Sequence, residues 1–355
     1  MRSKKPSSSR VLWIAFAIVL VDMLGVGILI PIIPLLFTDP AYPYHLNISA
    51  HTGYILLGVL TAIYPLMQFG AMPVLGQLSD VYGRKPLLVL TLFGSAIAYA
   101  LFAIGIITRN IPLLFVSRAI DGVTGASIAV AQAAIADTTD EDHRIKSFGY
   151  ISAANGIGFI LGPLVGAFLS ESRFHHALGA PSPFWFAAII SILNMIAVIF
   201  FMPETHRRKA KKRIQVWQSI GNIKHALTER GRRYIFITSF LFHSGFAFVI
   251  TFFGVFLVFR FGFQQDSIGY IFAFVGFMLA LTQIVVTGPL AKRVDARVVI
   301  PVALFIMAAS LVGIYFAPNI VLLYVFVLPG AVAGSLILAN LTGLVSTTSE
   351  ERDHG

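Results

Sequence analysis

Residues 11–36 read VLWIAFAIVLVDMLGVGILIPIIPLL, and Asp22 is the only charged residue among them. An apolar helix of about 20 residues crosses the roughly 30 Å hydrocarbon core of a bilayer. The stretch therefore predicts a membrane-spanning helix. It is too long for the apolar core of a secretory signal peptide, so we expect a retained first span. At about 1.5 Å per residue, Asp22 lies about 17 Å from Val11, close to the bilayer midplane.

Nine further apolar runs follow, separated by charged or Pro/Gly-rich segments. Hydrophobic residues make up 57% of the 355 residues and charged residues 12%, about half the share typical of soluble domains. This composition excludes a water-soluble fold, and the runs are too continuous for the strands of a membrane barrel. The predicted fold class is an all-α polytopic membrane protein. The nine runs are 53–75, 87–107, 112–135, 147–170, 184–202, 234–259, 268–290, 298–317 and 320–345.

The basic residues fall mainly on one side of the predicted membrane. Of the 26 Lys and Arg residues, 22 lie in the first ten residues, in alternate loops or in the tail, and three lie in the other loops. Cytoplasmic loops are enriched in Lys and Arg. We therefore expect both termini in the cytoplasm. We attribute the formal net charge of +10 to these basic cytoplasmic loops, and we expect no nucleic-acid partner.

The longest polar segment follows the sixth run and divides the chain. We predict an N-terminal six-helix bundle over 1–202, a cytoplasmic linker over 203–233 and an incomplete C-terminal bundle of four helices over 234–355. The chain has no cysteine, which excludes a disulfide scaffold and thiolate metal sites. It also lacks the phosphate-binding loop of ATP-hydrolysing proteins. We expect no metal, no cofactor and no enzymatic activity.

Four sequence motifs follow one another along the chain. Residues 76–85, GQLSDVYGRK, resemble the loop-two signature G-x-L-x-D-x-x-G-R-[KR] of the major facilitator superfamily. Three segments resemble the first-, fourth- and fifth-helix signatures of the proton-driven drug antiporters in that family: 22–34, 118–125 and 158–166. Two shorter segments, 64–68 and 135–138, are similar to the tetracycline-resistance-type antiporters.

The resemblance implies a major-facilitator fold in a bacterial-type cytoplasmic (inner) membrane. It also implies a monomeric, proton-coupled antiporter that exports small lipophilic or amphipathic compounds such as drugs. Family members usually have twelve spans, so spans 11 and 12, roughly 45 to 60 residues, are expected to be absent here as a C-terminal truncation. Tetracycline exporters carry acids in spans three and nine, whereas span three here has Ala98 at that place. Two alternatives stay open: a proton symporter importing a metabolite, and a truncated membrane protein without transport activity.

Three charged residues lie inside the predicted spans. Because charge in hydrocarbon is costly, an intramembrane Asp or Arg is a functional hypothesis by default. Asp22, Arg118 and Asp121 lie at overlapping depths, and a spacing of three places the last two on one face of span four. We predict that Asp22 carries the proton, that Arg118 stabilises its deprotonated form, and that Asp121 competes for this arginine. A fixed ion pair between spans one and four is the alternative.

The loop-two motif is predicted to be a conformational latch. We expect Arg84 to pair with Asp137 at the end of span four, and Asp80 to cap the N-terminus of a neighbouring helix, which the resemblance identifies as span eleven. Such contacts favour the outward-facing state. A solvated turn at Gly83 is the alternative. The predicted latch residues are Gly76, Asp80, Gly83, Arg84, Lys85 and Asp137.

Span five carries glycines at every fourth position, which form a flat stripe where another helix can approach closely. Pro163 removes a hydrogen bond and bends this helix. The predicted helix-packing antiporter motif comprises Gly158, Gly162, Pro163 and Gly166. Gln68, Asn155 and Gln283 are predicted to line the substrate cavity, with hydrogen bonding between helices as the alternative. The expected partners are a small-molecule substrate, protons and the lipid bilayer.

Overall fold

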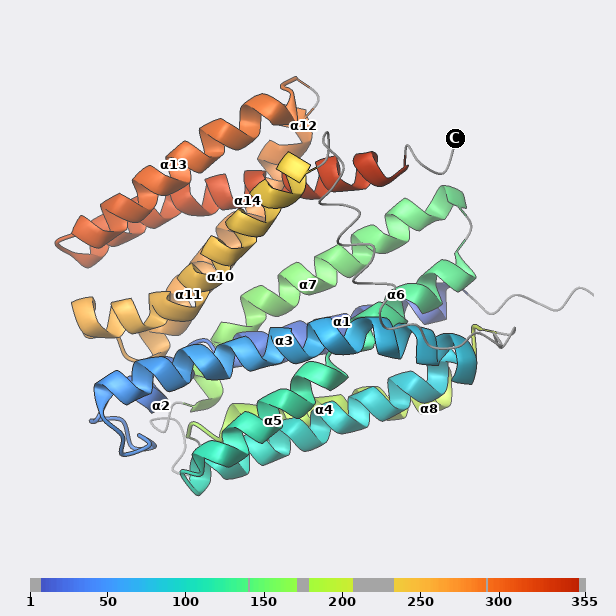
Figure 1. Ribbon diagram of the computed structural model, residues 1–355, viewed down its shortest axis with the longest axis horizontal. Coiled ribbons are helices and arrows are strands. Elements are labelled where there is room, and N and C mark those ends of the chain that lie inside the picture. The colour runs from blue at the N-terminus through green and yellow to red at the C-terminus, as the bar shows by residue number, and fades with distance from the viewer. Residues whose placement is uncertain (1–7, 140, 171–178, 207–232, 292, 351–355) are drawn as a thin grey trace, which may run out of the picture. The chain divides into compact units, whose positions relative to one another are not determined.

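The computed structural model describes residues 8–139, 141–170, 179–206, 233–291 and 293–350. All regular elements in these ranges are helices, and ten spans are long and apolar enough to cross a membrane (Figure 1). The all-α class and the ten predicted spans are therefore confirmed. Most of the predicted linker, residues 207–232, lies outside the described ranges, as do residues 351–355.

The chain divides into two compact units. The first contains the residues up to 216 together with 263–269, and the second contains 217–262 and 270–355. The described start of the predicted linker, residues 203–206, thus belongs to the first unit. The helices of the first unit are α1 (Ser8–Ile28), α2 (Ile33–Thr38), α3 (Ala50–Tyr82), α4 (Arg84–Ile107), α5 (Ile111–Thr124), α6 (Ser127–Thr138), α7 (Glu141–Ser170) and α8 (Ser182–Phe201).

The first unit is organised around α1. This helix packs against α7, α6 and α8, while α4 packs against α8 and α5, and α3 packs against α5. Figure 1 shows α1, α3, α4 and α7 running in roughly the same direction. Aliphatic side chains of α1, α4, α6 and α8 fill the space between these helices and exclude solvent from it. Fully buried members of this core include Ile18, Leu88, Leu92, Ala134 and Val198.

Two of the predicted spans are present but are each interrupted by a short segment that is not helical. Span one is interrupted at residues 29–32, where Pro31 lacks the backbone N–H that a continuing helix needs. Span four is interrupted at residues 125–126, between α5 and α6, and no proline marks this place. The second interruption makes Ser127 the first residue of α6, and the backbone N–H of Ala129 bonds to Ala126, which frees the carbonyl oxygen of Gly125 from the regular helical pattern.

The second unit contains α10 (Arg233–Phe261), most of α11 (Gln265–Thr282), a π-helical turn η1 (Gln283–Thr287), α12 (Gly288–Ala291), α13 (Ala296–Phe316) and α14 (Ile320–Glu350). Span eight is thus not one regular helix over 268–290, because it changes to π geometry at Gln283. Helices α13 and α14 pack along each other, and α10 also packs against α14. Their shared core contains Phe242, Ile300, Ala303, Ala333 and Ile337.

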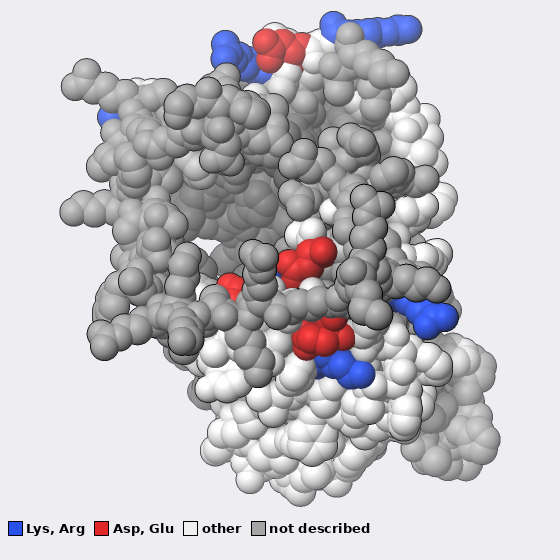
Figure 2. Space-filling model, turned by 90° about the vertical axis from the view of Figure 1, so that its right-hand side faces the viewer, with Lys and Arg blue, Asp and Glu red and all other residues white. Residues whose placement is uncertain are grey.

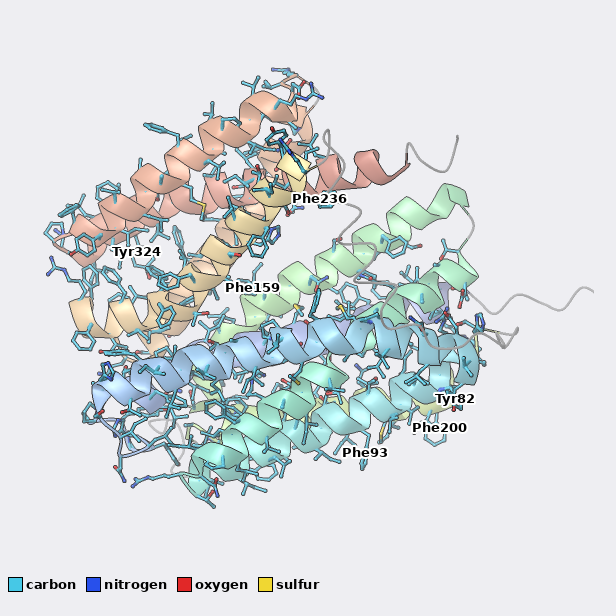
Figure 3. The ribbon with its side chains drawn as sticks, in the orientation of Figure 1. Tyr82, Phe93, Phe159, Phe200, Phe236 and Tyr324 are labelled. Carbon is cyan, nitrogen blue, oxygen red and sulfur yellow. The ribbon has the colours of Figure 1, made fainter. Side chains whose placement is uncertain are left out.

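Charged and apolar side chains occupy different parts of the surface. Figure 2 looks onto the end of the molecule where α3 ends and α4 begins, and it shows acidic side chains grouped beside basic ones. Large apolar side chains instead point outward along the helices. Phe93 of α4 is 50% exposed and Phe200 of α8 is 74% exposed, and both point away from the neighbouring helices (Figure 3). This distribution fits helices whose sides face lipid and whose ends face water.

Candidate functional site

A cluster of three charged side chains lies inside the first unit. Asp22 of α1, Arg118 of α5 and Asp121 of α5 are each at most 6% exposed. All three were predicted as proton-coupling residues, and the structure brings them into one buried region. We call them the buried charge cluster.

Arg118 pairs with Asp121 rather than with Asp22. The Arg118 Nη1 atom lies 2.5 Å from Asp121 Oδ2, and the guanidinium carbon lies 4.4 Å from the centre of the Tyr64 ring. The ring face attracts the cation and adds to the stability of the buried ion pair. Arg118 Nε is buried and has no hydrogen-bond partner among the described residues. The arginine therefore retains a donor that could serve a second acceptor.

Asp22 is bound by a hydroxyl group. The Oγ of Ser127 donates a hydrogen bond to Asp22 Oδ2. Ser127 stands at the start of α6, so the interruption of span four positions this donor. The Gln68 amide donates to the freed carbonyl oxygen of Gly125 at 3.0 Å, which satisfies the backbone at the same break. Ser127 was not among the predicted site residues, because its approach to Asp22 depends on how two helices pack.

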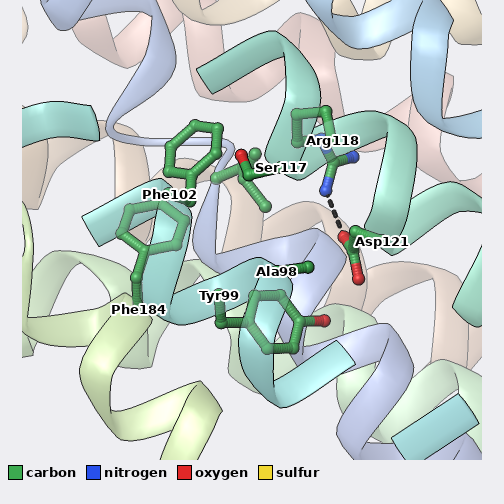
Figure 4. A pocket seen from close by; sticks show the side chains of 8 residues that line it. Ala98, Tyr99, Phe102, Ser117, Arg118, Asp121 and Phe184 are labelled. Carbon is green, nitrogen blue, oxygen red and sulfur yellow. Dashed lines mark hydrogen bonds and ion pairs between the residues drawn. The ribbon is translucent and has the colours of Figure 1, made fainter. Parts of the chain in front are cut away.

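A narrow pocket lies beside the Arg118–Asp121 pair (Figure 4). The rings of Phe102 and Phe184, whose centroids are 4.5 Å apart, close one side of it. The hydroxyl of Tyr99 points toward the carboxylate of Asp121 on the other side. The pocket thus joins an aromatic wall to a buried ion pair. Its lining residues are Leu29, Ala98, Tyr99, Phe102, Ser117, Arg118, Asp121 and Phe184.

The glycine stripe of α7 packs against α1, the helix that carries Asp22. A Cβ atom added to Gly162 would lie 2.6 Å from the Cα of Gly27, and one added to Gly158 would lie 2.8 Å from the carbonyl oxygen of Leu20. One added to Gly166 would similarly meet the backbone of Ile28 at 2.7 Å. Side chains at these positions would push the two backbones apart. The predicted close approach is present, and its partner helix is α1.

The loop-two motif forms a compact ion-pair cluster at the junction of α3 and α4. Arg84 Nη2 lies 2.6 Å from Asp80 Oδ1, Arg84 Nε lies 3.1 Å from Asp137 Oδ2, and Arg84 also donates to Ser79. The expected Arg84–Asp137 pair is therefore present. Asp80 binds Arg84 of its own motif in this structure. The turn itself requires glycine at residue 83, because its φ angle is +107°.

Glu204, which the sequence analysis did not single out, caps α4. Its carboxylate accepts the backbone N–H groups of Arg84 at 2.9 Å and Lys85 at 3.2 Å, and a Cβ atom on Gly83 would lie 2.5 Å from Glu204 Oε2. A carboxylate at a helix N-terminus satisfies free N–H groups and interacts favourably with the helix dipole. Glu204 thereby ties the end of α8 to the latch.

The remaining predicted residues lie in different surroundings. A Cβ atom at Gly76 would meet nothing within 4 Å among the described residues, so close packing does not explain this glycine. Gln68 is occupied with Gly125 and Tyr64, and the Asn155 amide donates to the backbone of its own helix at 3.3 Å. Gln283 is exposed at the start of the π-helical turn. The described ranges contain no group of three or more potential metal ligands.

The ten apolar spans and the buried charge cluster define a polytopic helical membrane protein with an ionisable centre. The sequence profile of the Major Facilitator Superfamily matches residues 15–355. The chain belongs to this family, and it is accordingly a membrane transporter and not an enzyme.

Known relatives support the same assignment. The class C tetracycline resistance protein of Escherichia coli is 34% identical over 294 residues, which cover 81% of this chain and 68% of that protein. The class B tetracycline resistance protein of Escherichia coli is 29% identical over 345 residues, which cover 96% of this chain and 81% of that protein. The crystal structure of the human organic anion transporter MFSD10 (TETRAN) matches the fold with a TM-score of 0.67 at 22% identity, covering 96% of this chain and 86% of that chain. The ten spans and the bacterial relatives support a multi-pass inner-membrane protein.

Proposed function

We propose that the protein is a monomeric proton-coupled antiporter that exports small lipophilic or amphipathic compounds by alternating access. The observation that carries this proposal is the buried charge cluster, in which Asp22 lies buried in the same unit as the Arg118–Asp121 ion pair. Arg118 compensates Asp121, while in the part of the chain that the structure describes the donor to Asp22 is the hydroxyl of Ser127. A carboxylate without a cation partner at this depth is a candidate for reversible protonation.

Protonation of Asp22 changes the net charge of the cluster between zero and minus one. In the deprotonated state, the spare Nε donor of Arg118 is available for a second carboxylate. Moving Arg118 toward Asp22 would weaken its bond to Asp121 and would bias α1 and α5 toward another packing arrangement. A proton can drive a conformational change only through such a difference between two states. We therefore assign the proton to Asp22 and the competing role to Asp121.

The distribution of basic residues supports a cytoplasmic location for both termini and, with them, for the latch. In this orientation the Arg84 cluster and the Glu204 cap hold α3, α4, α6 and α8 together at the inner end of the first unit. These contacts would stabilise one state of the transport cycle, for which we propose the outward-facing one. Substrate release would then be followed by opening of the latch.

Export of lipophilic compounds is supported by the names of the relatives, which are tetracycline resistance proteins, and by the aromatic lining of the pocket. Ala98 lines this pocket. The tetracycline exporters that this chain resembles carry an acid at the corresponding place. We therefore propose a substrate range that does not depend on a carboxylate in span three. Tetracycline and ethidium are suitable probes because both are planar and amphipathic.

The test is probe uptake into inverted membrane vesicles with an imposed pH gradient, acid inside. Wild-type vesicles should accumulate the probe, and Asp22→Asn vesicles should not, because an amide cannot release a proton. Asp39→Asn, which changes an acid in the loop after α2, is the matched control and should behave like wild type. Gradient-driven uptake by Asp22→Asn at the wild-type rate would refute the proposed role, and uptake only with the gradient reversed would indicate a symporter.

A further inference from the structure

Tyr99 of α4 inserts its hydroxyl group next to α1. Its side chain is buried, with 3% exposure. A Cβ atom added to Gly25 would lie 1.8 Å from the Tyr99 hydroxyl oxygen, so only a glycine leaves room for this hydroxyl. Gly25 follows Asp22 by three residues, which places both on one face of α1. The notch at Gly25 therefore admits the hydroxyl of Tyr99 close to the proposed proton carrier.

The Tyr99 hydroxyl also reaches the other carboxylate. Tyr99 and Asp121 line the same pocket, and Figure 4 shows the hydroxyl directed toward the Asp121 side chain. The charged and titratable groups around it come from three helices: Asp22 of α1, Tyr64 of α3, and Arg118 and Asp121 of α5. The hydroxyl thus contributes a neutral donor between two acids that repel each other.

We propose that Tyr99 is a positioning residue that keeps Asp121 on Arg118 and thereby leaves the exchangeable proton to Asp22. The inference rests on the proposed function, because it specifies which of the two carboxylates exchanges the proton. Asp121 is paired with the guanidinium of Arg118, and the hydroxyl of Tyr99, which is directed toward the same carboxylate, is the second donor in this proposal. Hydrogen bonds to a charged group are stronger than neutral ones, so the loss of one donor changes the competition for the arginine.

Without the hydroxyl, Asp121 depends on Arg118 alone. The arginine has an unused Nε donor and a second acid nearby, so its position becomes less well defined. The proton would then be divided between the two carboxylates, whose titration is coupled. A conformational change driven by a proton that has two alternative sites is weaker than one driven by a single site.

The experiment is infrared difference spectroscopy of purified full-length protein between acidic and alkaline buffer. In the wild type, the carboxyl C=O band in the acidic sample should disappear in Asp22→Asn and persist in Asp121→Asn. In Tyr99→Phe, a second band should appear that survives Asp22→Asn and is lost in Asp121→Asn. Proton-driven efflux of Tyr99→Phe should fall by roughly 10-fold, the effect of losing one hydrogen bond to a charged group. Tyr150→Phe, at a partly exposed position of α7, is the matched control and should change neither readout.

Gly25→Ala tests the notch without removing the hydroxyl. It should reproduce the second band, because the added Cβ atom would lie 1.8 Å from the hydroxyl oxygen and 2.5 Å from the ring carbon Cζ and so would displace the Tyr99 side chain. If Gly25→Ala does not fold, Tyr99→Phe and its controls decide the question alone. An unchanged spectrum in folded Tyr99→Phe would overturn the inference. Failure of the proposed function is seen separately, as normal gradient-driven transport by Asp22→Asn.

Discussion

Replacement of Gly162 by alanine should separate α1 from α7 and destabilise the first unit. The new Cβ atom would lie 2.6 Å from the Cα of Gly27 and 2.8 Å from the carbonyl oxygen of Leu24. Both neighbours are backbone atoms, so neither can rotate away. Bringing the first contact to 3.4 Å, where ordinary van der Waals contact begins, requires the helices to move apart by roughly 0.8 Å. A gap of about 0.5–1 Å forfeits roughly a quarter to a half of the dispersion energy of each affected contact.

The same helix offers a control. A Cβ atom at Gly156 would meet nothing within 4 Å among the described residues. Gly156→Ala and Gly162→Ala gain the same helix propensity, up to about 1 kcal/mol, but only the second carries an overpacking cost of about 1–3 kcal/mol. At about 2–4 °C per kcal/mol for a unit of this size, Gly162→Ala should melt roughly 2–12 °C below Gly156→Ala.

The melting temperatures can be followed by the intrinsic fluorescence of Trp13 and Trp185, since the chain has no cysteine for thiol-reactive dyes. The two variants should be compared in one detergent and at one protein concentration. Gly156→Ala should melt at or slightly above the wild-type temperature. Equal melting temperatures for the two alanine variants would refute the account, because they would show that the α1–α7 contact has room for a methyl group.

Two further predictions concern polar contacts outside the buried charge cluster. Glu204→Gln keeps an acceptor at the N-terminus of α4 but removes its charge, so the free energy of unfolding should fall by about 0.5–1 kcal/mol. The backbone amides of Arg84 and Lys85 should then exchange hydrogen faster with solvent. Unchanged exchange rates would contradict the role of Glu204 as a cap. Burial raises the pKa of Tyr42, whose hydroxyl donates to Gln265 Oε1 at 3.0 Å. The neutral phenol is therefore the form favoured by folding, and its contribution, about 1 kcal/mol, is complete below pH of about 10 and declines as the pH rises further. Tyr42→Phe should thus melt below wild type at pH 8 and approach it at pH 11, and a constant difference would contradict this reasoning.

The apolar runs alone predicted the fold class and the ten spans, because hydrocarbon thickness sets a length that any sequence must meet. The breaks within the spans were harder to predict. The first coincides with Pro31, which lacks a backbone donor, but the interruption at residues 125–126 has only small residues and no missing backbone donor. It is stabilised by the Gln68 amide, which comes from another helix and leaves no local sequence signal.

The site was also predicted only in part, because some of its contacts join residues that are far apart in the sequence. Arg118 and Asp121 are three residues apart on one helix, so their pairing follows from helical geometry. The hydrogen bond from Ser127 to Asp22 joins residues 105 positions apart, and the cap from Glu204 to the Arg84 amide joins residues 120 apart. Such contacts depend on the register of packed helices, which a single sequence does not show.

The central claim is that Asp22 carries the transported proton, and proton release on ligand binding tests it most directly. Purified protein in weakly buffered detergent solution would be mixed with a probe that the wild type exports, with a pH indicator as the readout. We expect the wild type to release about one proton per chain, Asp121→Asn to release a similar amount, and Asp22→Asn to release none while still binding the probe. Wild-type proton release by Asp22→Asn would contradict the account.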